Sequence, residues 1–177
     1  MNEVLIHARY NQAGNKTIYG LLDKMSNDDR EKDRGSFYGS LSGLFRHIAD
    51  GTRFFLGMYK IALDGNAAAV KAISAIENIP QLPEGPLSGA QWKELESAAA
   101  AFDAAYVAMA EALQESDLSL PVKIEWYREN PASVPLSFLL SQLLVHNTHH
   151  RGQISQILDS LKIDNDYSGI DVSFLCN

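Results

Sequence analysis

Residues 146–153 read HNTHHRGQ, which puts three histidines in one short stretch of the chain. On an α-helix each residue advances by about 100°, so side chains four positions apart lie on one face. His146 and His150 therefore share a face. Apolar residues recur seven positions away from members of this pair, at Leu139, Leu143 and Ile157. The spacing predicts that both imidazoles point into the protein core.

Imidazoles on a buried face need polar partners, because an unpaired buried polar group costs about 1 to 3 kcal/mol. Gln153 lies seven residues after His146 and adds another polar side chain to this face. His47, on the flank of a second apolar seam, supplies a further imidazole. Three imidazole nitrogens with positions left for water or substrate are typical of a catalytic zinc site, and nickel, iron or manganese also fits. We therefore predict a divalent metal ion bound by His47, His146 and His150, and the alternative is histidines that are exposed or hydrogen-bonded singly.

The other histidines and the cysteine lack such a setting. His149, three residues after His146, is the competing ligand. It has only the polar Gln142 and Gln156 seven residues away, so we expect it to be exposed or at the edge of the site. His7 lies among residues of no evident constellation. Cys176 is the only cysteine, which excludes an internal disulfide and a thiolate-rich zinc cluster.

Four segments with helical periodicity must position these residues, and their expected bounds are 4–25, 36–63, 88–115 and 136–162. The apolar seam of the second segment begins at Phe37. Ser88 and Gln91 form a capping-box pattern at the start of the third. Amphipathic helices of this length bury their apolar faces by packing together. The sequence therefore predicts an all-α fold, a four-helix bundle, in a single domain spanning residues 1–177.

The periodicity changes before the last helix. In PVKIEWY, the apolar Val122, Ile124 and Trp126 alternate with other side chains, as in a strand. ENPAS then predicts a turn, and Val134 with Pro135 a second short strand. We expect a small β-hairpin at this place.

Composition limits the classes of partner. The net charge is −7 and the pI is near 5.1, so binding to nucleic acid through a basic face is not expected. The chain has no apolar run near the roughly 18 residues that a membrane span needs, and its first residues lack the pattern of a signal peptide. We expect a cytoplasmic protein.

Three stretches together resemble the DinB-like family of damage-inducible four-helix proteins: YNQAGNKTIYGLL, RGSFYGSLSGLFRHIADGTRFF and HNTHHRGQI. The HxxxHRGQ element is the specific part, whereas Tyr10, Asn11 and Asn15 only support it. The resemblance implies a bundle with an unusual order of connections, commonly a homodimer. It also implies a divalent metal ion on one histidine of the second helix and two of the last.

Carried over residue by residue, these ligands fall on His47, His146 and His150, the trio that the spacing selects. One departure concerns the residues after the first ligand. Many similar members have Asp-Arg five and six positions later, where this chain has Thr52 and Arg53, although Asp50 is close by.

The rest of the motif has ordinary interpretations. Arg151 is expected to be solvated or paired with a carboxylate, and Gly152 to mark a close contact between helices. Gln153 is interpreted as a hydrogen-bond partner of a metal-bound water or of a ligand imidazole.

Three functions are consistent with such a site. The resemblance implies a metal-dependent transferase that uses a low-molecular-weight thiol, which coordination to the metal would hold as the thiolate nucleophile. Metal-assisted hydrolysis needs a carboxylate base, for which Asp50 is the candidate. The third is a stress-response protein that binds a metal without catalysis.

Overall fold

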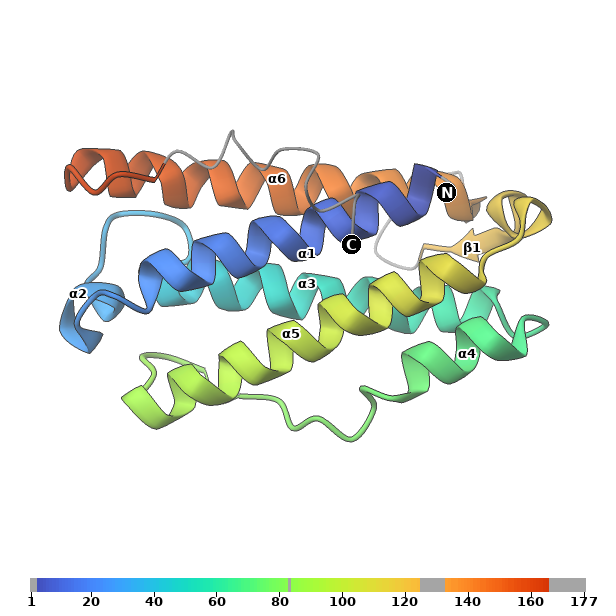
Figure 1. Cartoon of the computed structure of the whole chain (residues 1–177), viewed down its shortest axis with the longest axis horizontal. Coiled ribbons are helices and arrows are strands. Elements are labelled where there is room, and N and C mark those ends of the chain that lie inside the picture. The colour runs from blue at the N-terminus through green and yellow to red at the C-terminus, as the bar shows by residue number, and fades with distance from the viewer. Residues whose placement is uncertain (1–2, 83, 125–132, 166–177) are drawn as a thin grey trace.

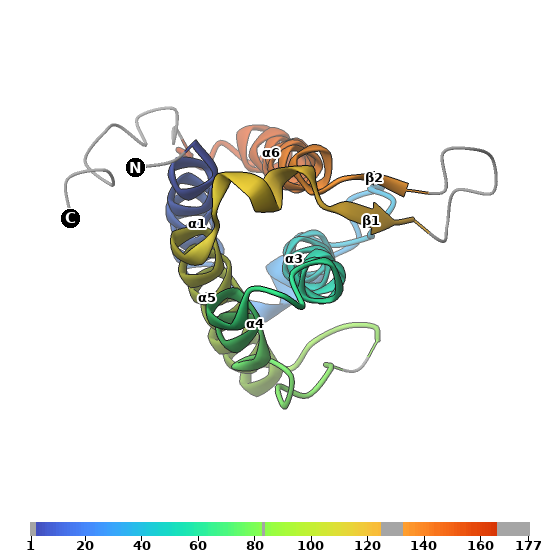
Figure 2. The same ribbon diagram turned by 90° about the vertical axis from the view of Figure 1, so that its right-hand side faces the viewer.

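The computed structural model describes residues 3–82, 84–124 and 133–165. Four long helices run along the molecule (Figure 1): α1 (Glu3–Leu22), α3 (Leu41–Ala62), α5 (Gly89–Ala112) and α6 (Leu136–Ser160). The most extensive packing is that of α3 on α6 and of α1 on α5. The end-on view in Figure 2 shows the hairpin extending on the side of α3 and α6. The all-α four-helix bundle with a small hairpin is thus confirmed.

The core consists of the apolar seams that the periodicity identified. Among its fully buried members are Leu44 and Ile48 of α3, Trp92 and Tyr106 of α5, and Leu143 of α6. Burying a side chain of this size stabilises the fold by about 1.5 to 3 kcal/mol. Together with the buried Ile18 and Leu22 of α1, these residues hold the bundle together along the apolar seams of its four long helices.

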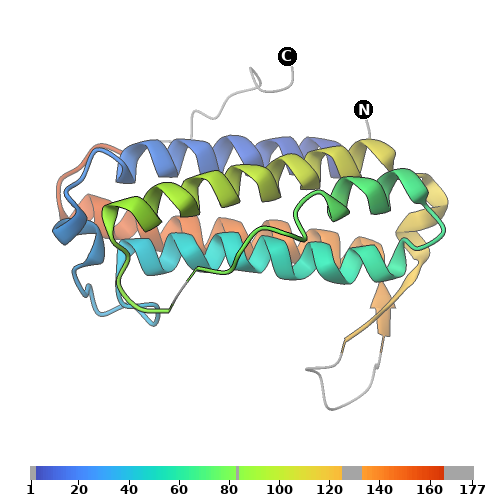
Figure 3. The same ribbon diagram turned by 90° about the horizontal axis from the view of Figure 1, so that it is seen from below.

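Three short helical segments connect the long helices. Helix α2 (Asn27–Glu31) lies between α1 and α3, outside the four predicted helices, and Ser26 caps it by accepting a hydrogen bond from the Asp29 amide. Helix α4 (Ala67–Ser74) packs against α5, as Figure 3 shows. A 3-10 helix, η1 (Glu115–Ser119), follows α5.

The start of α3 differs from the prediction, and the difference matters for the site. The helix begins at Leu41 instead of residue 36, and Phe37 is 92% exposed instead of buried. Gly39 has a φ of 72°, which an α-helix cannot include, and Ser40 caps α3 by accepting from the Gly43 amide at 3.0 Å. Residues 36–40 therefore form a turn that packs beside the helix.

The other helix ends agree with expectation to within a few residues. Helix α1 ends at Leu22, three residues early, because the chain turns toward α2. The capping box of Ser88 and Gln91 at the start of α5 is confirmed, with both reciprocal hydrogen bonds present.

The predicted hairpin is present. Strands β1 (Pro121–Lys123) and β2 (Ser133–Pro135) pair antiparallel, with Val122 opposite Val134. Trp126 and most of the expected ENPAS turn lie outside the described residues, as does Cys176.

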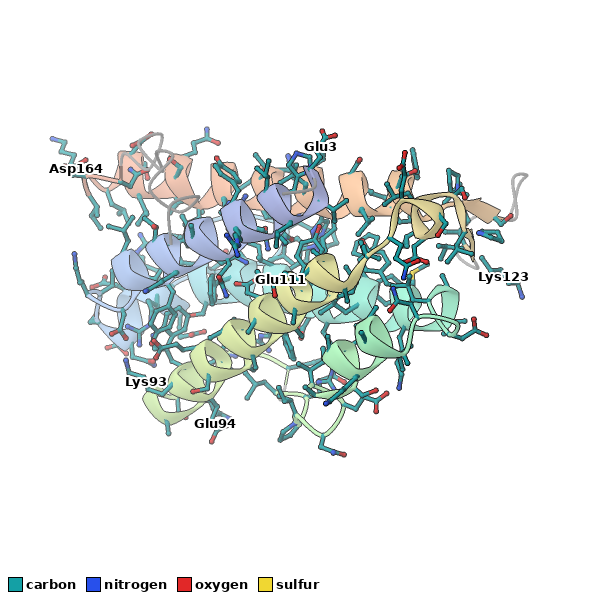
Figure 4. All side chains as sticks on the ribbon, turned by 45° about the vertical axis from the view of Figure 1, so that its right-hand side comes forward. Glu3, Lys93, Glu94, Glu111, Lys123 and Asp164 are labelled. Carbon is teal, nitrogen blue, oxygen red and sulfur yellow. The ribbon has the colours of Figure 1, made fainter. Side chains whose placement is uncertain are left out.

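Charged side chains line the outer surface of the bundle, including the six labelled in Figure 4: Glu3, Lys93, Glu94, Glu111, Lys123 and Asp164. Within the described ranges, every helix is too short or too polar to cross a membrane.

Candidate metal centre

Three histidines from two helices meet at the interface of α3 and α6. His47 comes from α3, and His146 and His150 come from successive turns of α6. One potential ligand nitrogen from each lies within 4.8 Å of the others, a spacing at which the three can hold one metal ion. The structure thus brings together the three residues that the sequence selected.

Hydrogen bonds from α6 orient two of these rings. His146 Nδ1 lies 2.9 Å from the amide oxygen of Asn147, and His150 Nδ1 lies 2.7 Å from the amide oxygen of Gln153. Because an amide oxygen only accepts, each Nδ1 carries the proton and each Nε2 keeps its lone pair. This is the usual arrangement around a metal-binding histidine, and it matches one of the two roles that the sequence suggested for Gln153.

Burial favours the neutral form of His47 and His150. Desolvation, followed by the neighbouring His150 and His146, lowers the pKa of His47 from 6.5 to about 4. Desolvation also lowers the pKa of His150, although the hydrogen bond to Gln153 opposes this effect. A neutral imidazole is the form that binds a metal, so these two residues are ready to do so at neutral pH.

A glycine on α3 makes room for one of the rings. A Cβ atom at Gly51 would lie 2.7 Å from Cε1 of His146, far inside normal contact. His146 therefore occupies space that any other residue at position 51 would fill. This close approach between α3 and α6 lies at the site itself.

A pocket of about 410 Å³ opens beside the cluster. Its lining includes His47, Tyr38, Arg46 and Asp50, together with further acidic residues. Burial raises the pKa of Asp50, opposed by Arg46 and Arg53. The pocket gives a small molecule a path to the face of the cluster that His47 presents.

Tyr38, in the turn before α3, contacts the cluster directly, and the sequence pattern did not identify it. Its hydroxyl lies 2.8 Å from His47 Nε2. Its ring stacks on that imidazole, with centroids 3.9 Å apart and planes at 19°. Burial raises the pKa of the Tyr38 hydroxyl, which therefore stays protonated at neutral pH.

Behind the cluster, buried amides lead from His146 into the bundle. Asn147 is fully buried and donates to Thr52 Oγ1 at 3.1 Å and to Asn11 Oδ1 at 3.0 Å. The hydroxyl of Thr52, at the position where the resemblance noted above leads us to expect aspartate, donates to the Ile48 carbonyl. Threonine at this position is therefore part of the support for His146.

This chain of hydrogen bonds continues to a buried carboxylate. Asn11 and Asn15 both donate to Asp103 on α5, at 3.0 to 3.1 Å. Arg151 donates in turn to the amide oxygens of Asn11 and Asn15. Burial raises the pKa of Asp103 to about 7, against the effects of Asn15, Arg151 and Asn11. These hydrogen bonds thereby link buried amides, a carboxylate and a guanidinium from three helices.

Two parts of the expectation for the HRGQ motif are wrong. Arg151 is not solvated: it is 2% exposed, it donates to the amide oxygens of Asn11 and Asn15, and its charge lowers the pKa of the buried Asp103 carboxyl. Gly152 lies away from other helices, with open space where a Cβ would stand. The close contact is made by Gly14 of α1, where a Cβ would lie 3.0 Å from Nε of Arg151.

The remaining two histidines are not part of the cluster of three. His149 is exposed and touches only the edge of the site, through a ring contact with His150 at 4.9 Å. His7 lies on α1 beside Glu3, at 3.9 Å. Both positions agree with the sequence-based expectation.

The buried polar residues behind the ligands follow a spacing that is visible in the sequence. Asn11 and Asn15 are four residues apart on one helix, and Asn147 and Arg151 are four apart on another. Each pair therefore shares a face, as the histidine pair does. Matching two such pairs to one another required the packing of α1 on α6.

The sequence model of the DinB family matches residues 1–161 of the chain. No curated protein and no solved structure gives a match.

Proposed function

Because the chain belongs to the DinB family, we propose that His47, His146 and His150 bind one divalent metal ion through their Nε2 atoms. The observation that carries the proposal is the convergence of three imidazoles from two helices. Zinc, nickel, iron and manganese all accept such a set of nitrogen donors.

The surroundings of the cluster support this proposal. The side-chain amides of Asn147 and Gln153 hold two rings through Nδ1, which leaves Nε2 of each ring to bind the ion. The acidic lining of the adjoining pocket favours entry of a cation. Each of these features lowers the cost of assembling a metal site.

We further propose that the bound ion serves a small-molecule reaction, because three protein ligands leave coordination positions for other groups. The resemblance to the family suggests a transferase that uses a low-molecular-weight thiol. The ion would supply a Lewis acid that favours the thiolate form of this thiol. The protein's own part is to hold the ligands and to admit the thiol through the pocket.

Two other functions are consistent with the same metal site. Asp50 lies in the same pocket and is the carboxylate that metal-assisted hydrolysis would need. A stress-response protein that binds metal without catalysis would show neither thiol binding nor hydrolysis.

A pair of adjacent histidine variants tests the metal site. His150→Ala should abolish stoichiometric metal binding, measured by elemental analysis after dialysis. His149→Ala is the matched control and should keep the metal, because its side chain is exposed. Full metal content in His150→Ala would overturn the ligand assignment.

Thiol binding tests the reaction class. The cobalt-loaded protein is titrated with 2-mercaptoethanol and monitored by absorption spectroscopy. A sulfur-to-metal charge-transfer band supports the thiol transferase, and its absence at saturating thiol excludes it. Removal of the metal should abolish the band while the helices persist, because the apolar seams do not depend on the ion.

A further inference from the structure

The turn before α3 places one phenol hydroxyl beside the metal ligands. Tyr38 Oη lies 2.8 Å from Nε2 of His47, the nitrogen that also lies 2.9 Å from Nε2 of His146. The Tyr38 ring meets His150 edge-on as well, with centroids 5.5 Å apart and planes at 83°. Tyr38 therefore contacts two of the three histidines.

The fold fixes this position through the backbone. A Cβ atom at Gly43 would lie 2.1 Å from the Tyr38 carbonyl oxygen, so the turn packs against α3 only because residue 43 is glycine. Gly39 takes a left-handed conformation with φ of 72°, and the Ser40 cap follows at once. The same turn thus positions the phenol and makes α3 begin at Leu41 instead of residue 36.

Metal binding would change the hydrogen bonding between Tyr38 and His47. A neutral ring nitrogen has either one proton or one lone pair to share. When Nε2 of His47 coordinates a metal, its lone pair is committed and it has no proton to donate. The Tyr38 hydroxyl then needs another partner at the same place.

The pocket supplies the route by which such a partner arrives. Tyr38 and His47 both line the cavity of about 410 Å³ that opens beside the cluster. A small molecule that enters it to reach the ion passes the phenol hydroxyl. The hydroxyl can donate a hydrogen bond to an anionic donor atom there, and a hydrogen bond to a charged partner is stronger than one between neutral groups.

We propose that Tyr38 is a catalytic residue that binds the exogenous ligand: its hydroxyl donates a hydrogen bond to the thiolate held at the open coordination position. This inference rests on the proposed function, because it requires the three histidines to bind a metal. It adds a protein group that contacts the substrate and that no comparison assigns. Tyr38 keeps its proton throughout, and no bond is made or broken at its oxygen.

Tyr38→Phe tests the inference, because it removes the hydroxyl and keeps the ring stacked on His47. The full-length protein is loaded with cobalt and titrated with 2-mercaptoethanol. We expect Tyr38→Phe to retain one equivalent of cobalt and to bind the thiol about tenfold more weakly. The charge-transfer band should also move to lower energy, because the sulfur orbitals lose the stabilising hydrogen bond. A residue that only supports the fold would not shift that band.

Tyr19→Phe is the control, since it removes a partly buried phenol hydroxyl that bonds to Glu96, away from the histidines. It should leave cobalt content, thiol affinity and band position unchanged. Unchanged thiol affinity and band in Tyr38→Phe would overturn the inference and leave the metal site standing. Loss of cobalt from Tyr38→Phe would also overturn it, because Tyr38 would then be needed to bind the metal. Failure of the wild-type protein to take up cobalt would instead overturn the proposed function.

Discussion

Substituting Gly51 by alanine should stabilise helix α3 but weaken metal binding, so the two effects can be measured separately. Gly51 lies in the middle of α3, where alanine is the better helix former by about 0.5 to 1 kcal/mol. The added Cβ, however, would stand 2.7 Å from Cε1 of His146, whereas ordinary contact begins at 3.4 Å. Because a packed core resists separation of the two helices, the imidazole itself must move by roughly 0.7 Å or turn away.

A displacement of this size should weaken metal binding. Disturbing the groups that orient a metal ligand typically costs about 10-fold to 100-fold in affinity, which corresponds to roughly 1.4 to 2.7 kcal/mol. We expect Gly51→Ala to lose affinity in this range. The assay is competition with a chromophoric chelator, accompanied by denaturant unfolding of the metal-free protein.

Gly57→Ala provides the matched control on the same helix. A Cβ at Gly57 meets nothing within 4 Å, so this variant should gain about 0.5 to 1 kcal/mol of stability and keep its metal affinity. Wild-type affinity in Gly51→Ala would refute the reasoning, because His146 would then not bind the metal from its present position.

Other changes test the supports of the site. Burial lowers the pKa of His47 from 6.5 to about 4, so the unfolded chain takes up a proton between these values that the folded chain does not. The free energy of unfolding of the metal-free protein should therefore be retained above pH 6.5 and fall toward pH 4, and His47→Gln should lose this component in denaturant titrations. Asp103→Ala should cost roughly 3 kcal/mol in thermal or denaturant unfolding, because the amides of Asn11 and Asn15 lose their acceptor, whereas Asp103→Asn keeps an acceptor oxygen and should cost less. The family resemblance also predicts a homodimer, and a monomeric sedimentation profile at micromolar concentration would contradict it.

The sequence determined the helices and the histidine pair because both depend on short-range periodicity. Apolar residues every three or four positions mark a buried face wherever a helix forms. His146 and His150 must share a face at four-residue spacing, and the capping box at Ser88 marks where α5 begins. These features need only local geometry, so they were predictable without the fold.

The role of His47 follows partly from its local sequence and partly from the packing of the helices. The position of His47 beside an apolar seam showed only that it could face inward. Its meeting with the α6 pair depends on α3 packing against α6, which the resemblance implied and the structure shows.

Only the tertiary structure decided what surrounds these rings. Tyr38 comes from a turn, whose direction follows no helical period, and it reaches His47 because Gly39 and Gly43 let the chain pass close to α3. Arg151 is typical of a solvated side chain in sequence, yet it is buried because Gly14 of α1 leaves space for it. Such contacts join residues far apart in the chain, and they follow from how closely two backbones approach, which residue spacing along one helix does not specify.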